Sequence, residues 1–230
     1  MNNTLQVKQS ALGILQTYPV FLRNTFFFVY PFPDPLYFFD FETISYAVPV
    51  FDGTAPYQQA PFQYSCHVLQ EDGTLTHHEY LHTEPGDPRP ALLEALLGDI
   101  GPTGQLIVYY APFEKGILQG LAQAFPEHGS RLQDMIDRLW DQLLVFKKHY
   151  RHYAFGKSNS LKSVLPVVVT GLSYEGMAIS NGLLAQVAWE EMIATADDAQ
   201  KQQLADDLLK YCHLDTLAMV EIHQVLTGLD

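Results

Sequence analysis

The stretch Leu36–Thr43, with the sequence LYFFDFET, joins an apolar run to two closely spaced carboxylates. The apolar residues predict a buried β-strand over residues 35–40. Side chains two positions apart share one face of a strand, so Asp40 and Glu42 should project together at its end. Two neighbouring carboxylates repel each other, and a divalent ion such as Mg²⁺ is the usual compensation. The stretch therefore predicts a strand that ends in a metal site, with a chance pair of acids as the alternative.

The segments that follow predict an α/β fold with a mixed sheet. A hairpin precedes alternating helices and strands, which favours a mixed sheet over a purely parallel one. Strands are expected over residues 62–69, 74–82, 105–110 and 143–146. Helices are expected over residues 88–98, from 112 onward, and over 130–140, 160–165 (ending at Pro166), 182–194 and 198–226.

The length of 230 residues fits one large domain. We expect this domain to span residues 34–230. Residues 1–33 should form an N-terminal helix and connection that packs on the domain, or the end of a linker from an upstream domain. A hydrophobic content of 47% with 13% aromatic residues is sufficient for a folded core.

Charge and cysteine usage limit the function classes. A formal charge of −13 argues against a protein that coats nucleic acid, although it leaves room for a local basic track and an acidic metal site. Two cysteines, Cys66 and Cys212, offer neither a disulfide framework nor a zinc-cysteine pattern. No apolar stretch is long enough for a membrane span, and no signal peptide is evident. A cytoplasmic protein is expected.

One segment of this acidic chain is basic. No acidic residue occurs between Gln142 and Tyr174, whereas five of the thirteen basic residues fall between positions 147 and 162. Aromatic residues interleave with them, a pattern that suits single-stranded nucleic acid; a solvated basic loop is the alternative. Four of these residues are the candidate nucleic-acid contacts: Lys147, Lys148, Arg151 and Lys162.

The histidines give a weaker signal. His149 and His152 are three residues apart, without an obvious third ligand. His77, His78 and His82 lie on a predicted strand. We expect both groups to be surface residues rather than metal ligands.

Two further carboxylates follow predicted elements. Tyr211 and Asp215 share one face of the last helix, since they are four residues apart. An inward-facing Asp needs a partner or a metal ion, although an Asp at the rim of the apolar stripe is the alternative. Glu114 opens a helix directly after a strand, where it could also simply complement the helix dipole.

The order of these motifs resembles the tyrosine-bearing branch of the DEDD superfamily of 3′→5′ exonucleases, which have a ribonuclease H-like fold. Asp141, in Leu139–Leu143, occupies the place of a structural Asp in that family, and Ser160–Leu165 resembles its S-L-x-x-L helix. Tyr174–Gly176 and Asn181-Gly182 are similar to an uncharacterised bacterial branch, often labelled a domain of unknown function, that forms the C-terminus of RecB-like nucleases.

The resemblance implies two Mg²⁺ or Mn²⁺ ions that clamp a scissile phosphate. Asp40 would bridge them, Glu42 and Asp215 would complete the first ion's site, Glu114 would support the second, and Tyr211 would orient the attacking water. The chain departs from the family at the second motif, where Tyr110 and Glu114 replace Asn and Asp. The longer Glu side chain would hold the second ion more loosely.

Three functions remain open. The first is a metal-dependent 3′→5′ exonuclease acting on single-stranded DNA or RNA, with an upstream RecB-like nuclease domain as its candidate partner. The second is a weak or inactive module that binds nucleic acid or a partner nuclease. The third is a hydrolase of small phosphate esters, which the lack of a Gly-rich phosphate loop does not favour.

Overall fold

The computed structural model describes residues 32–228 of the chain. The helix and connection predicted over residues 1–33 lie almost entirely outside the described residues. Within residues 32–228, no helix is both long enough and apolar enough to cross a membrane.

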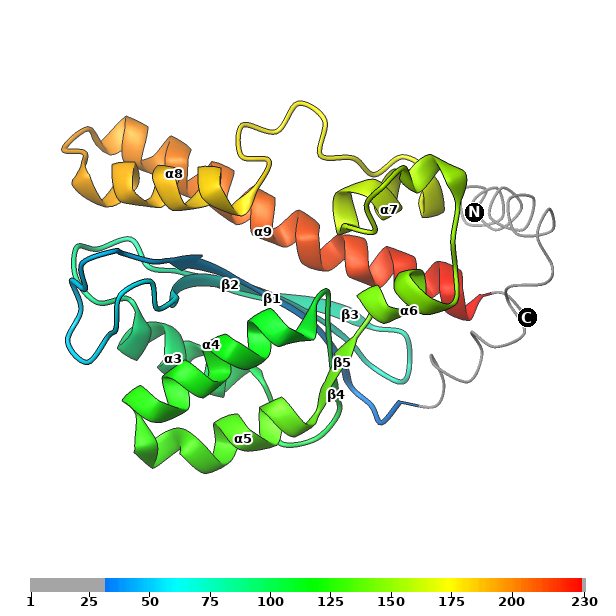
Figure 1. Cartoon of the computed structure of the whole chain (residues 1–230), viewed down its shortest axis with the longest axis horizontal. Coiled ribbons are helices and arrows are strands. Elements are labelled where there is room, and N and C mark those ends of the chain that lie inside the picture. Colours follow the sequence, from blue (N-terminus) through cyan, green and yellow to red (C-terminus); the bar gives the residue numbers. More distant parts are fainter. Residues whose placement is uncertain (1–31, 229–230) are drawn as a thin grey trace.

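A five-stranded mixed sheet forms the centre of the domain (Figure 1). Its strands lie in the order β3-β2-β1-β4-β5. The pairs β1–β2 and β2–β3 are antiparallel, whereas β1–β4 and β4–β5 are parallel. This confirms the predicted α/β class with a mixed sheet flanked by helices. The strands are β1 (Leu36–Ile44), β2 (Ala60–Leu69), β3 (Leu75–Leu81), β4 (Gln105–Val108) and β5 (Leu139–Asp141).

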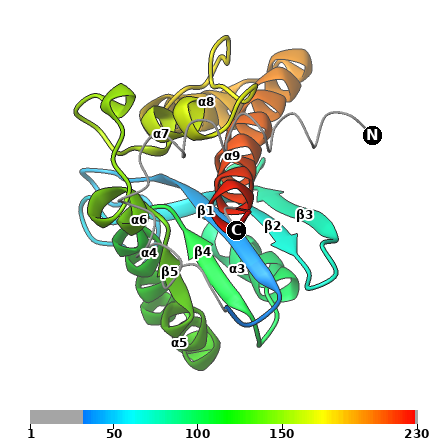
Figure 2. The same cartoon turned by 90° about the vertical axis from the view of Figure 1, so that its right-hand side faces the viewer.

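Helices cover both faces of the sheet (Figures 1 and 2). One face packs against α3 (Arg89–Asp99), α4 (Ala111–Ala124) and α5 (Gly129–Asp137). The long helix α9 (Asp198–Thr227) crosses the other face, with α8 (Gly182–Ala194) beside its first half. The shorter elements are α6 (Leu143–Lys148), α7 (Leu161–Val168) and the 3-10 turns η1 (Pro126–His128) and η2 (Tyr153–Phe155).

The side chains of β1 point alternately to the two faces of the sheet, and so they contact both layers of helices. Phe39 and Phe41 point into the core beneath α3, α4 and α5. Phe38 faces the opposite way and packs against Met219 and Val220 of α9. Because strand side chains alternate, Asp40 and Glu42 share the face of Phe38 and lie beneath α9.

Several local predictions are wrong. The helix expected over residues 130–140 ends at Asp137, because Leu139–Asp141 pairs with β4 as strand β5. Leu143–Phe146 is helical: α6 begins after Gln142, the Leu143 N–H donates to the Asp141 carboxylate at 3.0 Å, and the helix buries Val145 and Phe146 in one cluster with residues of α7 and α9. Pro166 does not end α7, which continues to Val168. Proline removes one helical hydrogen bond, and burial of the Val164, Leu165 and Val168 side chains offsets that loss.

Candidate metal centre

Asp40 and Glu42 lie within β1, not at its end as predicted, because pairing with β2 continues to Ile44. Parallel pairing between β1 and β4, however, extends only over Leu36–Phe38. Asp40 therefore follows the last residue that pairs with β4. Ligand sites in open α/β sheets lie outside the carboxyl ends of the parallel strands, which is the position of these two acids.

Glu114 reaches the same place from α4. Its side chain is only 1% exposed, although it sits in the first turn of the helix. Among the described residues, its buried Oε2 atom has no hydrogen-bond partner. Simple dipole compensation needs neither this burial nor an unpaired oxygen, so the geometry favours a ligand role over a capping role.

Helix α9 supplies Tyr211 and Asp215, both buried and on one face as the i,i+4 spacing predicts. Two glutamines anchor the helix on either side of them. Gln63 of β2 donates to the Leu208 carbonyl at 2.9 Å, and Gln142 donates to the Met219 carbonyl at 3.0 Å. These two hydrogen bonds thus fix the position of α9 along the sheet and place Asp215 close to Asp40.

The pKa values of all four acids rise. Burial, followed by the charge of Asp215, raises the pKa of Asp40 to about 8. A hydrogen bond with Glu114 and the charge of Lys162 act against this rise. Burial raises the pKa of Asp215 to about 6, against hydrogen bonds from two tyrosines and the charge of Lys162. Burial followed by repulsion from Asp40 raises the pKa of Glu42 and of Glu114 well above its usual range. The cluster holds protons that a cation could replace.

Lys162 lies inside this cluster, not on the outer basic track where the sequence suggested it. Its ammonium group donates to the Tyr211 hydroxyl at 2.8 Å and to the Ser180 carbonyl. It also lies 4.8 Å and 5.3 Å from the ring centroids of Tyr211 and Tyr174. Lys162 therefore acts as a fixed counter-charge to the carboxylates.

Tyr174 is the site residue to which the sequence assigned no role. Its hydroxyl donates to Asp215 Oδ1 at 2.5 Å. The only signal for it was the Tyr174–Gly176 motif. Gly182 of the neighbouring motif begins α8, and a Cβ atom there would lie 3.5 Å from Glu42 Oε2. Both motifs thus border the carboxylates.

Asp141 has the structural position that the sequence predicted. Its Oδ1 atom accepts hydrogen bonds from the backbone N–H groups of Tyr110 and Leu143, both at 3.0 Å. Tyr110 precedes α4 with a positive φ of 92°, an uncommon conformation for a residue with a side chain. Asp141 holds that turn and so helps to place Glu114.

A cleft of about 670 Å³ is lined by Asp40, Glu42 and Asp215, whereas the buried Glu114 is not among its lining residues. Of the predicted basic contacts, Lys147 and Lys162 line it, and Lys157 joins them. Lys148 and Arg151 are exposed but are not among the lining residues. The lining of the cleft therefore combines three carboxyl groups with three lysines.

The donor set fits hard divalent cations. Asp40, Glu42, Glu114 and Asp215 offer carboxylate oxygens, the ligands that Mg²⁺ and Mn²⁺ prefer. Cys212 also has a ligand atom within 4.8 Å of those of Asp40 and Glu42. Burial raises the pKa of its thiol, which points at the Asp40 carbonyl at 3.9 Å, so it is a poor ligand.

Residues 37–160 match the family described as "Domain of unknown function (DUF2779)". The chain belongs to this family. The DUF2779 match contains Asp40, Glu42 and Glu114 but ends before Tyr211 and Asp215.

Three curated relatives resemble a larger part of the chain. The "Uncharacterized protein MG366 homolog" of Mycoplasma pneumoniae is 28% identical over 207 residues. "Uncharacterized protein MG366" of Mycoplasma genitalium is 25% identical over 207 residues. "Uncharacterized protein UU173" of Ureaplasma parvum is 24% identical over 222 residues. The alignments cover 80%, 80% and 84% of this DUF2779 chain, respectively, but only 31% of each relative. The chain thus spans under a third of the length of these relatives. No solved structure matches it.

Proposed function

We propose that the domain is a metal-dependent 3′→5′ exonuclease that hydrolyses the phosphodiester bonds of single-stranded DNA or RNA. One observation carries the proposal: the pKa values of the buried acids Asp40, Glu42, Glu114 and Asp215 are all raised, and three of these acids line a cleft together with three lysines. The same four acids, with Tyr211, resemble the set of the tyrosine branch of DEDD exonucleases.

Two Mg²⁺ or Mn²⁺ ions are the proposed cofactors. Asp40 would contact both ions, Glu42 and Asp215 one of them, and Glu114 the other. When bound, the ions would activate water and stabilise the charge on the leaving 3′-oxygen. The unpaired Oε2 atom of Glu114 is the specific reason for assigning that residue to a ligand role.

Tyr211 would orient the attacking water. Burial and the charge of Asp215 raise the pKa of its phenol, so the hydroxyl keeps its proton and can donate it in a hydrogen bond. Lys162 already fixes the phenol oxygen from one side at 2.8 Å. The hydroxyl is thus held rigidly next to Asp215, which is the requirement for positioning a nucleophile.

Lys147 and Lys157 would neutralise phosphates along the cleft wall. Tyr110, 49% exposed, also lines the cleft and lies 5.4 Å from the Lys147 ammonium group. An exposed ring beside a lysine suits stacking under a base with the cation on the adjoining phosphate. Both features favour a single strand, whose bases are free to stack.

A binding module is the second candidate. The observation that favours it is the second motif, where Tyr110 replaces a polar amide and the longer Glu114 replaces Asp. If these changes weaken the second ion, the domain would hold a strand without cutting it. In the curated relatives the matching region is part of a longer chain, which accommodates a RecB-like nuclease as the proposed upstream partner.

A strand-shortening assay separates the two candidates. We would incubate 5′-labelled single-stranded DNA and RNA of one sequence with the protein in Mg²⁺, Mn²⁺ or EDTA. The exonuclease predicts a metal-dependent ladder that shortens from the 3′ end, with nucleoside 5′-monophosphates released. Glu42→Gln should abolish it, whereas Glu94→Gln, the same change at an exposed position of α3, should not. Retained binding without shortening would favour the module.

A further inference from the structure

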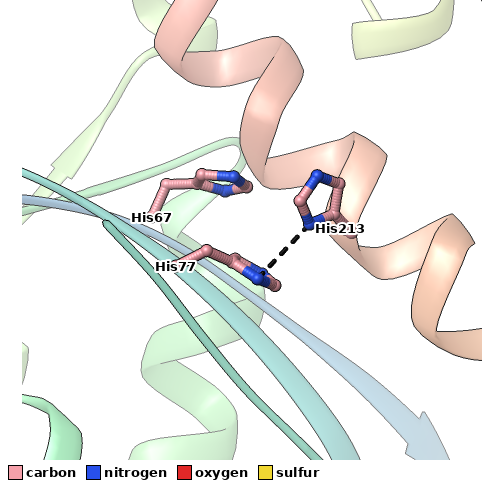
Figure 3. A group of neighbouring side chains, drawn as sticks. All are labelled: His67, His77 and His213. Carbon is pink, nitrogen blue, oxygen red and sulfur yellow. Dashed lines mark hydrogen bonds between the residues drawn. The ribbon is translucent and has the colours of Figure 1, made fainter. Parts of the chain in front are cut away.

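Three histidines cluster on the α9 face of the sheet, apart from the four acids. His67 of β2 and His77 of β3 are directly paired across the hairpin, and His213 approaches from α9 (Figure 3). The ring centroids are 4.3 Å apart for His67–His77 and His77–His213, and 4.7 Å apart for His67–His213. His77 was expected at the surface, but it is partly buried, and its ring lies beside both of the other two.

The ring nitrogens have the spacing of metal ligands. One nitrogen from each ring lies within 4.8 Å of the others, and the Nδ1 atoms of His77 and His213 are 3.4 Å apart. A tetrahedral Zn²⁺ ion with Zn–N bonds of about 2.0–2.1 Å separates two of its ligand atoms by roughly 3.4 Å. Without an ion, the same approach lets one ring donate a hydrogen bond to the other.

Two of the rings make hydrogen bonds to buried hydroxyl groups. His67 Nδ1 lies 2.8 Å from Thr216 Oγ1, and His77 Nε2 lies 2.9 Å from Ser65 Oγ. The two hydroxyls are 2.7 Å apart, and Thr216 also reaches the His213 carbonyl at 3.2 Å.

One arrangement of protons uses all of these contacts. His67 Nδ1–H and Ser65 O–H both donate to Thr216, His77 Nε2–H donates to Ser65, and Thr216 donates to the His213 carbonyl. This arrangement leaves lone pairs on His67 Nε2 and His77 Nδ1. Metal-binding histidines characteristically donate their second ring N–H in this way.

Two of the rings are neutral at physiological pH. Burial, followed by the neighbouring His77 and His213, lowers the pKa of His67 to about 3. Burial, followed by His213 and His78, lowers the pKa of His77 to about 4. Neutral imidazole is the form that coordinates a metal ion. The Glu79 carboxylate, 3.9 Å from His77 Nε2, adds a nearby negative charge.

We propose that His67, His77 and His213 form a second metal site, for Zn²⁺ or a similar divalent transition metal, with a fourth position open to water. Imidazole nitrogens select such ions, whereas the carboxylate site selects Mg²⁺ or Mn²⁺. The bound ion would join the β2–β3 hairpin to α9. Because His213 lies two residues from both Tyr211 and Asp215, this link would fix the part of α9 that carries them.

The test measures metal uptake in the full chain with the carboxylate site disabled by Glu42→Gln. After chelator treatment, we expect this protein to bind one equivalent of Zn²⁺ in the presence of excess Mg²⁺, with a rise in melting temperature. Co²⁺ should give the intense visible absorption of a tetrahedral nitrogen-ligated ion. Failure to bind Zn²⁺ or Co²⁺ would overturn the proposal and leave a hydrogen-bonded histidine cluster.

Variants in the same background locate the ion. His77→Gln should lower the Zn²⁺ affinity more than about 100-fold, and Thr216→Val, which keeps the side-chain volume, by about 10–100-fold. His128→Gln, in η1 after α4, removes a histidine elsewhere and should change nothing. Unchanged affinity in His77→Gln and in His213→Gln would place the ion elsewhere and refute the site. None of these readouts depends on nuclease activity.

Discussion

The hydroxyl group of Tyr174 lies 2.5 Å from Oδ1 of Asp215, and it joins the loop before α8 to the middle of α9. The bond lowers the pKa of Asp215, which burial raises to about 6, because it favours the ionised carboxylate. Asp215 therefore ionises more readily near neutral pH than Asp40, whose pKa is raised to about 8.

Tyr174→Phe should destabilise the metal-free protein by about 1.5–3 kcal/mol at pH 8, because a buried carboxylate loses a charge-assisted hydrogen bond. The loss should be smaller at pH 5, where Asp215 is mostly protonated. Urea unfolding at both pH values measures it. The same change at Tyr153, which is 84% exposed, is the control and should cost nothing measurable. Equal losses at the two pH values would contradict the ionised state of Asp215.

Asp40→Asn should leave the metal-free protein as stable as the unaltered protein or more stable, because it removes a repelling acid from a buried cluster. It should also abolish the stabilisation by Mg²⁺ or Mn²⁺, which amounts to about 2.7 kcal/mol at 100 times the Kd. Melting curves with and without metal provide the measurement. A metal-induced gain that survives in Asp40→Asn and Asp215→Asn would show that the ions bind elsewhere.

Asp40 and Asp215 should make the metal-free protein less stable as pH rises from about 4 to about 8, whereas His67, His77 and His223, whose pKa values are lowered, act in the opposite direction below about pH 6.5. Asp40 and Asp215 have pKa values of about 8 and 6, above the 3.8 of an unperturbed Asp. In this interval these two acids bind more protons in the folded state than in the unfolded state, so each extra proton costs up to about 1.4 kcal/mol per pH unit. Urea midpoints across the interval measure the slope, which should be shallower in Asp40→Asn. An identical profile in the unaltered protein and in Asp40→Asn would refute the raised pKa of Asp40.

Lys162→Met should shift Mn²⁺ binding to higher pH. The ammonium group lowers the pKa of Asp40, Glu42 and Asp215, so without it these acids retain protons that compete with the metal until a higher pH. Mn²⁺ titrations across pH locate the midpoint. Lys157→Met, on the exposed wall of the same cleft, is the matched control. If both variants moved the midpoint equally, the effect would be one of general cleft charge rather than of Lys162.

Lys147→Gln should weaken the binding of single-stranded DNA more than Lys148→Gln does. Lys147 lines the cleft beside Tyr110, whereas Lys148 is exposed outside it. Removal of one phosphate contact should reduce the slope of log K against log salt by about 0.7. Fluorescence anisotropy at several salt concentrations measures both values. The two lysines would have to be treated as one diffuse basic surface if their variants were indistinguishable.

Much of the fold follows from local patterns. Three local patterns predicted elements correctly, because each involves only neighbouring residues: the apolar run before Asp40, the hairpin around Gly73 and the 3.6-residue period of α9. The errors occurred where a tertiary contact outweighed the local signal. The apolar run after Gln142 resembles a strand, but it forms a helix that buries Val145 and Phe146 against α7 and α9. Pairing with β2 extends β1 four residues past Asp40.

The sequence by itself determined the α/β class, the places of the acids along the chain and the shared face of Tyr211 and Asp215, because strand and helix periodicities are local. Only the tertiary structure placed Lys162 against Tyr211, Tyr174 against Asp215, and His213 against the hairpin. These pairs are 41 to 136 residues apart in the sequence. Strand register and the height of α9 on the sheet decide such contacts, and both depend on the packing of the whole domain.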